Sequence, residues 1–213
     1  TLDPLVARGT FGNGNLSFAP ATNVSYSGAI SNFMVSSGKW YCEFRCDNEA
    51  GGTIIPGIYE LENKGFRDVF GGSNFFGKSL ETDETAGARF DLVADDGDIV
   101  SMYMDLDSSP ITVSLTVNGG NATTFSSDSL TQNYNNLIPG RTYGFGAADA
   151  QSGTINIQFT FNFGQNPTFC GQTIAGTFTD SNGKGLFKYE PPTGFLALCD
   201  DNLPTPAVAD PGK

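Results

Sequence analysis

The sequence predicts an all-β sandwich, and its composition and patterning support that prediction. The 213 residues include 27 Gly, 18 Phe and 7 Tyr but only 16% charged residues, which is typical of turns and of aromatic strand residues. Short strand-like runs recur between clusters of Gly, Asn, Asp and Ser, without a sustained helical period. Because all-β units often reach this length undivided, we expect one domain over residues 1–201 and a Pro-rich linker or tail over residues 202–213.

The strand with the clearest pattern covers residues 38–46. Its even-numbered residues share one face, which we expect to be core, and its odd-numbered residues share the other face. A second strand is expected from Ile54 to Tyr59, where Pro56 and Gly57 favour a sheet edge or a bulge. The expected core face of the first strand consists of Trp40, Cys42, Phe44 and Cys46.

Two antiparallel pairs follow further along the chain. Residues 98–105 and 111–117 form a hairpin candidate, and Asn118-Gly119, which tolerate positive φ, predict another tight turn before a strand at 123–125. We expect residues 142–148 and 154–163 to pair with each other as well. In the last of these segments, polar residues alternate strictly with Ile155, Ile157, Phe159, Phe161 and Phe163.

The charge balance excludes several classes of partner. A formal net charge of −12 and a pI near 4.1 would repel phosphate backbones and anionic membrane surfaces, so we expect neither nucleic-acid binding nor membrane insertion. The sequence also contains no His, which excludes Ser-His-Asp and Cys-His catalysis and His-ligated metals. We therefore expect no cofactor and no metal.

Carboxylate-pair glycoside hydrolysis stays open in principle, because two acids suffice for it. However, a chain with 23 Asp and Glu residues contains such pairs by chance, and we expect a protein without enzymatic activity. The acids that could be nominated are Glu43, Glu60, Glu81, Asp83 and Glu84.

Cysteine and aspartate residues have structural interpretations. Cys42 and Cys46 would lie about 13 Å apart along one strand, which is too far for a disulfide. Cys170 and Cys199 could pair, although we favour buried, reduced thiols for all of them. The Asp residues of segments 95–98 and 105–107 do not fit a calcium-binding loop, and we expect them to cap turns.

Several runs together resemble the SPRY family, in the form found in bacteriophage virion structural proteins. Early in the chain these runs are Ser36 to Glu43 and Gly97 to Asp107, with Val117-Asn118-Gly119 after the second. Near the end they are Asn162 to Phe169, Tyr189 to Leu198 and Asn202 to Pro206. Residues 171–185 stand out as an insertion between these later runs. The resemblance implies a bent β-sandwich of two antiparallel sheets, a concanavalin-like jelly roll, that recognises partners through its loops.

The resemblance also implies a place on the phage particle surface. We expect a tail-fibre or head-fibre module that binds a host-surface glycan or protein. Because fibres are commonly trimers, we expect a homo-oligomer of this kind. The alternative is a capsid decoration protein that contacts neighbouring virion proteins. Aromatic, amide and basic residues in two poorly patterned segments, 62–88 and 125–141, are the candidate contacts, unless the aromatic rings turn inward as anchors. These candidates are Phe66, Arg67, Phe70, Phe75, Phe76, Lys78, Tyr134 and Asn135.

Overall fold

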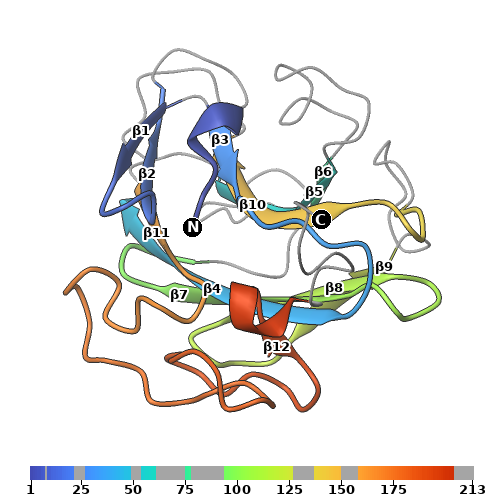
Figure 1. Cartoon of the computed structure of the whole chain (residues 1–213). Helices are drawn as coiled ribbons and strands as arrows, with labels where there is room; N and C mark the ends of the chain where they lie inside the picture. The colour runs from blue at the N-terminus through green and yellow to red at the C-terminus, as the bar shows by residue number, and fades with distance from the viewer. Residues whose placement is uncertain are drawn as a thin grey trace, which may run out of the picture.

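The computed structural model contains two antiparallel β-sheets that face each other, as the sequence predicts (Figure 1). Within the described residues, the larger sheet has the order β1-β2-β11-β4-β7-β8-β9, with β12 parallel to β4, and the smaller sheet has the order β3-β10-β5-β6. The structure describes residues 1–7, 9–21, 27–48, 54–60, 75–77, 94–126, 137–149 and 158–203.

The larger sheet is built from β1 (Gly9–Gly12), β2 (Ser17–Pro20), β4 (Lys39–Asn48), β7 (Ile99–Asp105), β8 (Thr112–Val117), β9 (Thr123–Ser126), β11 (Gln158–Asn162) and β12 (Leu196–Ala197). The smaller sheet is built from β3 (Ser27–Ile30), β5 (Ile54–Glu60), β6 (Phe75–Gly77) and β10 (Tyr143–Asp149). Two short 3-10 helices, η1 (Pro4–Val6) and η2 (Asp200–Asn202), lie near the ends of the described chain. No helix of the described residues is long and apolar enough to cross a membrane.

The main core lies between the two sheets and contains the predicted face of β4. Its even-numbered residues Trp40, Cys42, Phe44 and Cys46 are all buried. The ring of Phe44 stacks on that of Phe161 from β11, with the ring centroids 5.5 Å apart. Removing such a ring from water stabilises a fold by about 1.5–3 kcal/mol, so the alternating pattern of these strands is sufficient to define this core.

The predicted hairpin is confirmed, together with the turns that flank it. β7 pairs with β8, and β8 pairs with β9 after a turn in which Asn118 has a φ of 50°. The Asp98 carboxylate accepts hydrogen bonds from the Asp95 backbone N–H and the Asn118 side chain. The Asp105 carboxylate likewise accepts from the backbone N–H groups of the next turn. Turn capping is therefore what these two aspartates do.

Two predictions about strand neighbours are wrong. β10 and β11 do not pair, because β10 lies between β3 and β5 in the smaller sheet, whereas β11 lies between β2 and β4 in the larger one. Consecutive strands of a sandwich can cross between sheets, and an alternating pattern does not specify which sheet a strand joins. β5 is not an edge strand either, since β10 and β6 flank it. Pro56 has no backbone N–H to donate, and the described pairs between β5 and β6 are those of Gly57 to Tyr59.

A third layer covers the outer face of the larger sheet. We call residues 163–203 the C-terminal layer; in Figure 1 they run in orange and red below the sheet, on the side opposite to the smaller sheet. Underneath this layer Tyr41 and Glu43 are fully buried, and the Tyr41 ring meets Phe187 edge-on at 4.8 Å between centroids. Both faces of β4 are therefore buried, where the sequence predicted one, and the predicted insertion 171–185 belongs to this covering layer.

The prediction of buried, reduced thiols is confirmed for two of the four cysteines. All four are free thiols, so Cys170 and Cys199 are not paired. Cys42 and Cys46 are buried in the core, as expected. Cys170 is exposed and Cys199 is half-buried, which contradicts the expectation of buried thiols, because both lie in the C-terminal layer and not in the sheets.

Candidate functional site

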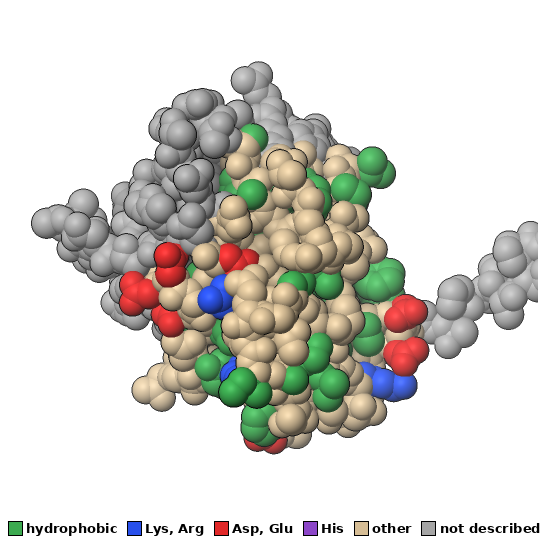
Figure 2. Space-filling model, turned by 90° about the vertical axis from the view of Figure 1, so that its left-hand side faces the viewer, with side chains coloured by type: hydrophobic (Ala, Val, Ile, Leu, Met, Phe, Trp, Pro, Cys, Tyr) green, Lys and Arg blue, Asp and Glu red, His purple; other side chains and the backbone are tan. Residues whose placement is uncertain are grey.

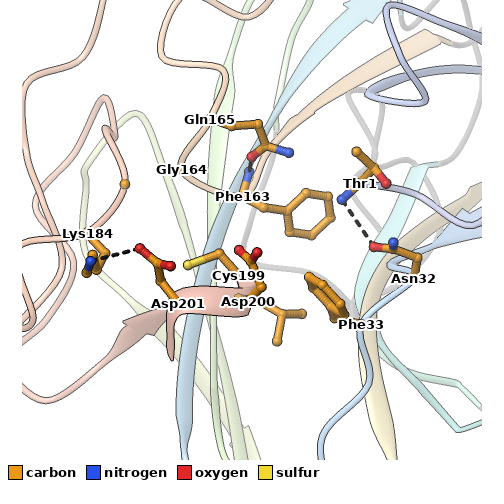
Figure 3. Close-up of a pocket in the computed structure, with 12 residues that line it drawn as sticks. Thr1, Asn32, Phe33, Phe163, Gly164, Gln165, Lys184, Cys199, Asp200 and Asp201 are labelled. Atoms are coloured by element: carbon orange, nitrogen blue, oxygen red, sulfur yellow. Dashed lines mark hydrogen bonds and ion pairs between the residues drawn. The ribbon is translucent and has the colours of Figure 1, made fainter. Parts of the chain in front are cut away.

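A cleft of about 500 Å³ lies at the end of the sandwich where the C-terminal layer meets the segment after β3 (Figure 3). We call it the Asp200 cleft. Its volume is in the range of small-ligand sites in proteins. It is lined by Thr1, Asn32, Phe33, Phe163, Gly164, Gln165, Lys184, Gly185, Leu198, Cys199, Asp200 and Asp201.

The first wall of the cleft follows directly from β3. The Ser31 backbone N–H donates to the carbonyl of Phe145, which keeps the chain on the smaller sheet for one residue beyond the strand. The next backbone N–H, that of Asn32, donates to the carbonyl of Thr1. The exposed Asn32 side chain and the half-buried Phe33 ring then line the cleft.

The second wall is the turn at the end of β11. The Asn162 side-chain oxygen accepts hydrogen bonds from the backbone N–H groups of Gly164 and Asn166, which folds the chain back under the sheet. Phe163 is 2% exposed, and its ring stacks on that of Phe161. This wall is therefore fixed by the core, and the exposed Gln165 side chain is placed by the turn.

The third wall is held in place by one buried carboxylate. One oxygen of Asp180 accepts from the backbone N–H groups of Asn182 and Lys184, and the other accepts from the backbone of Ala197 and the side chain of Asn202. These bonds join the loop before Lys184 to η2. The second and third walls then touch at two glycines, since a Cβ on Gly164 would lie 2.8 Å from the Cα of Gly185.

The two acids of the cleft differ in their surroundings. Asp201 forms an ion pair with Lys184, with 2.8 Å between Nζ and Oδ2, and this contact raises the pKa of the Lys184 ammonium. The Asp200 carboxylate receives no hydrogen bond or ion pair from any described residue. Figure 3 shows it directed upward into the cleft on the side of Phe163, whereas Asp201 is turned toward Lys184. Asp200 is thus available to a ligand.

The thiol of Cys199 in the cleft is not activated as a nucleophile. Burial raises the pKa of the Cys199 thiol, and Asp180 and Asp200 add to this effect against two backbone hydrogen bonds. A thiol with a raised pKa carries little thiolate at neutral pH and is a poor nucleophile. Among the described residues, no group of three or more Cys, Asp or Glu is placed to hold a metal ion.

Glu43 is the nominated glycosidase acid that the structure describes in full, and it cannot reach a substrate. It is 0% exposed beneath the C-terminal layer. Both of its oxygens accept hydrogen bonds from the protein itself, from Tyr41, Asn162, Lys188 and Tyr189. Burial raises the pKa of Glu43, although these hydrogen bonds oppose the shift. Its role is to hold the C-terminal layer on the sheet.

The structure does not test the ligand-contact residues that were proposed from the sequence. Phe75 and Phe76 belong to β6, whose backbone pairs with Tyr59 and Ile58, but their side chains lie outside the described part of the structure. The other six candidates lie wholly outside the described residues: Phe66, Arg67, Phe70, Lys78, Tyr134 and Asn135.

The cleft residues themselves carried little signal in the sequence. Asn32, Phe33 and Gln165 are isolated among many similar residues, and Asp200 and Asp201 look like the polar end of a domain. They come together because the ends of β3, β11 and β12 meet in space, and chain segments about 130 to 170 residues apart give no local pattern for that meeting.

Comparisons with known proteins bear on the fold alone. No protein-family model and no curated protein matches the chain. The crystal structure of the SPRY domain of human HERC1 superimposes with a TM-score of 0.52 at 13% identity, over 76% of this chain and 96% of that domain. The TRIM65 PSpry domain gives 0.47 at 13% identity, over 76% and 90%. A peanut lectin in complex with a nine-residue peptide gives 0.43 at 16% identity, over 72% and 88%. The match to the HERC1 domain shows that the chain has the two-sheet sandwich fold of that SPRY domain.

Proposed function

We propose that this chain is a non-enzymatic recognition domain that binds its partner in the Asp200 cleft. The observation that carries the proposal is the cleft itself, where an unpaired carboxylate, two side-chain amides and an accessible aromatic ring converge from three separate segments. Such groups form hydrogen bonds to hydroxyl and amine groups and pack against apolar faces. Sugars and polypeptide side chains both offer these features.

The surroundings of the described acids support binding over hydrolysis. A glycosidase needs one carboxylic acid with a raised pKa next to a second carboxylate, and both must face the substrate. Glu43, whose pKa is raised, is sealed under the C-terminal layer. Asp201, next to Asp200 in the cleft, is occupied by Lys184.

The place of this domain on a phage particle, as a fibre module that binds a host-surface glycan or protein, is proposed from sequence resemblance alone. It rests on the runs that begin at Asn162, Tyr189 and Asn202. The first two of these runs form parts of the C-terminal layer, and they supply the cleft with Phe163, Gln165 and Leu198. The segments that carry the resemblance thus also build much of the proposed binding site.

A second candidate function, capsid decoration, is favoured by apolar side chains on the surface of the C-terminal layer. Ile174 is 84% exposed, and Phe178 and Leu186 are each 43% exposed. Figure 2 shows hydrophobic side chains gathered over the lower part of one face, where this layer lies. Exposed apolar groups of this kind are typical of surfaces that contact another protein.

One experiment separates the two functions. The fluorescently labelled domain is incubated with intact candidate host bacteria and, in parallel, with purified capsids that lack it. Phe33→Ala removes a ring from the cleft, and Phe178→Ala removes an exposed ring that does not line it. Unchanged unfolding temperatures of both variants confirm that they fold.

We expect retention on the cells, lost after periodate oxidation of a surface glycan or after protease treatment of a surface protein. This retention should be weakened by Phe33→Ala and not by Phe178→Ala. Saturable binding to capsids that Phe178→Ala weakens, with no retention on cells, would instead establish decoration. Retention on cells that is insensitive to Phe33→Ala would rule out the cleft as the binding site.

A further inference from the structure

We infer that the side chains of Thr160 and Gln172 form an intramolecular ester, which joins β11 covalently to the C-terminal layer. In this reaction the Thr160 hydroxyl replaces the amide nitrogen of Gln172, and neighbouring side chains of the same chain assist. The reaction happens once in each molecule and uses no external substrate. It therefore goes beyond the proposed function and does not depend on the Asp200 cleft.

The nucleophile is the buried hydroxyl of Thr160 on β11. Thr160 is 0% exposed, and its hydroxyl donates a hydrogen bond to Oδ2 of Asp47 on β4. The Ser17 hydroxyl also lies 3.1 Å from Thr160 Oγ1 and serves as a donor there, because the single proton of Thr160 is given to Asp47. The other oxygen of Asp47, Oδ1, forms an ion pair with Arg45, which orients the carboxylate. A nucleophile, a base and a group that orients the base are thus connected, as hydroxyl nucleophiles require.

The electrophile is the side-chain amide of Gln172 in the C-terminal layer. Its Oε1 accepts a hydrogen bond from Nη1 of Arg45, and its Nε2 donates to Thr160 Oγ1 at 3.5 Å. This orientation of the amide is required, because a guanidinium has only donors and must face the oxygen. An amide C–N bond is about 1.3 Å long, so the amide carbon Cδ lies within about 4.8 Å of Thr160 Oγ1. The two atoms that react are therefore neighbours.

Both reacting side chains come from segments that the fold holds in place. Thr160 lies in β11, between β2 and β4 of the larger sheet. The backbone N–H of Gln172 donates to the carbonyl of Thr168 at 2.9 Å, and the fully buried Phe169 anchors the same turn. Folding has thus already supplied most of the entropy needed to bring the groups together. In well-oriented intramolecular reactions this is equivalent to a concentration on the order of 10⁵–10⁸ M.

The reaction is an exchange of an amide for an ester in two steps. First, Oγ1 of Thr160 bonds to Cδ of Gln172 while Asp47 takes the hydroxyl proton, and the charge that develops on Oε1 is stabilised by Arg45, which already donates to that oxygen. Second, the bond between Cδ and Nε2 breaks, and Asp47 returns the proton to the nitrogen, which leaves as ammonia. Asp47 and Arg45 end as they began. Ammonia is protonated at neutral pH and diffuses away, which suppresses the reverse reaction.

The ester adds a covalent attachment of the C-terminal layer to the hydrogen bonds that already hold it. Glu43 binds the backbone at 188 and 189 by hydrogen bonds, which break whenever the layer lifts. The ester instead joins the beginning of the layer to β11 permanently. A cross-link of this kind restricts the unfolded chain and so raises the free energy of unfolding. Because Thr160 is fully buried, its ester oxygen is shielded from hydrolysis by water.

Mass spectrometry of the full chain tests the inference, because the ester makes the protein lighter by the mass of one ammonia. The chain is then unfolded and digested with chymotrypsin, which cleaves after Phe161, Phe163 and Phe169. This cleavage separates Thr160 from Gln172 unless the two are linked. Mild alkaline hydrolysis breaks an ester but leaves an amide intact, and so identifies the kind of bond.

Three variants identify the groups that form the bond. Gln172→Glu removes the nitrogen that leaves as ammonia, and Gln158→Glu makes the same change at an exposed glutamine of β11 outside this cluster. Asp47→Asn keeps the shape of the side chain but replaces the carboxylate that takes the proton. Circular dichroism and the unfolding temperature of each variant confirm that it folds.

We expect wild type and Gln158→Glu to be lighter by one ammonia and to give a chymotryptic species that contains both Thr160 and Gln172 and separates in alkali. Gln172→Glu should keep its full mass. Asp47→Asn should form the bond at least about 100-fold more slowly, the lower end of what a general base contributes. Wild type that keeps its full mass after prolonged incubation at neutral pH, a loss of ammonia that persists in Gln172→Glu, or an unchanged rate in Asp47→Asn would overturn the inference.

Discussion

Replacement of Glu43 by Ala should weaken the attachment of the C-terminal layer to the sheet. The carboxylate accepts four hydrogen bonds, but two donors have other acceptors within reach. Tyr41 also donates to Ser101, and the side chain of Asn162 also donates to the carbonyl of Leu186. The two donors that lose their acceptor are the backbone N–H groups of the residues at 188 and 189.

The expected loss in the free energy of unfolding follows from these two N–H groups that are left without an acceptor. A buried donor without an acceptor costs about 1–3 kcal/mol, which gives roughly 2–6 kcal/mol for two. Burying the carboxylate has a free-energy cost, which is also what raises the pKa of Glu43, and its removal in Glu43→Ala recovers this cost. We therefore expect a loss in the lower half of that range, about 2–4 kcal/mol. Glu43→Gln keeps one acceptor oxygen and should lose less than Glu43→Ala.

Urea denaturation measures these losses as changes in the free energy of unfolding. Glu190→Ala, at an exposed glutamate of the same layer, is the matched control and should change stability by less than about 0.5 kcal/mol. Equal, small losses in Glu43→Ala and Glu190→Ala would refute the reasoning that the buried carboxylate holds the layer. A loss in Glu43→Gln as large as in Glu43→Ala would show that shape, not hydrogen-bond acceptance, is what matters.

The raised pKa of Glu43 also gives its contribution to stability a definite pH dependence. The unfolded chain releases this proton near pH 4.3, whereas the folded protein holds it to higher pH. The folded state therefore binds more protons in the window between the two pKa values, and the free energy of unfolding falls as pH rises through it. The difference in stability between wild type and Glu43→Gln should shrink from pH 4.5 upward, and a growing difference would contradict the direction of the shift.

Three further predictions concern single residues. Cys170 is exposed, whereas Cys42 is buried and burial raises the pKa of its thiol, so a thiol reagent should label Cys170 in the folded protein and Cys42 only after unfolding. Gly119 has a φ of 69°, and a Cβ there would lie 2.6 Å from the ring of Tyr189. Gly119→Ala should therefore lower the free energy of unfolding by at least about 1–2 kcal/mol, and a neutral effect in urea denaturation would count against this packing. Trp40 is 4% exposed, so its fluorescence should shift to longer wavelength on unfolding, and emission typical of water in the native state would show that this end of β4 is open.

The sequence by itself determined the fold class and the inner core. Alternation in β4 and β11 specifies a face that must avoid water, and turn residues such as Asn118 and Asp105 specify where the chain reverses. These are local properties, because the period of two and the backbone preferences of turn residues act within a few positions. That is why the hairpin of β7 and β8 and the burial of Phe44 were predictable.

Only the tertiary structure decided which strands are neighbours, what covers the outer face of the larger sheet, and where the cleft lies. The alternation in residues 154–163 has the same form whether that strand pairs with β10 or with β4, so pairing is settled by the packing of the whole sandwich. Glu43 looked like a surface acid because nothing near it in sequence covers it. Residues almost 150 positions away, at 188 and 189, donate the hydrogen bonds that make its burial possible. The cleft arises in the same way, since Asn32 and Asp200 meet only when the C-terminal layer folds back beneath the sheet.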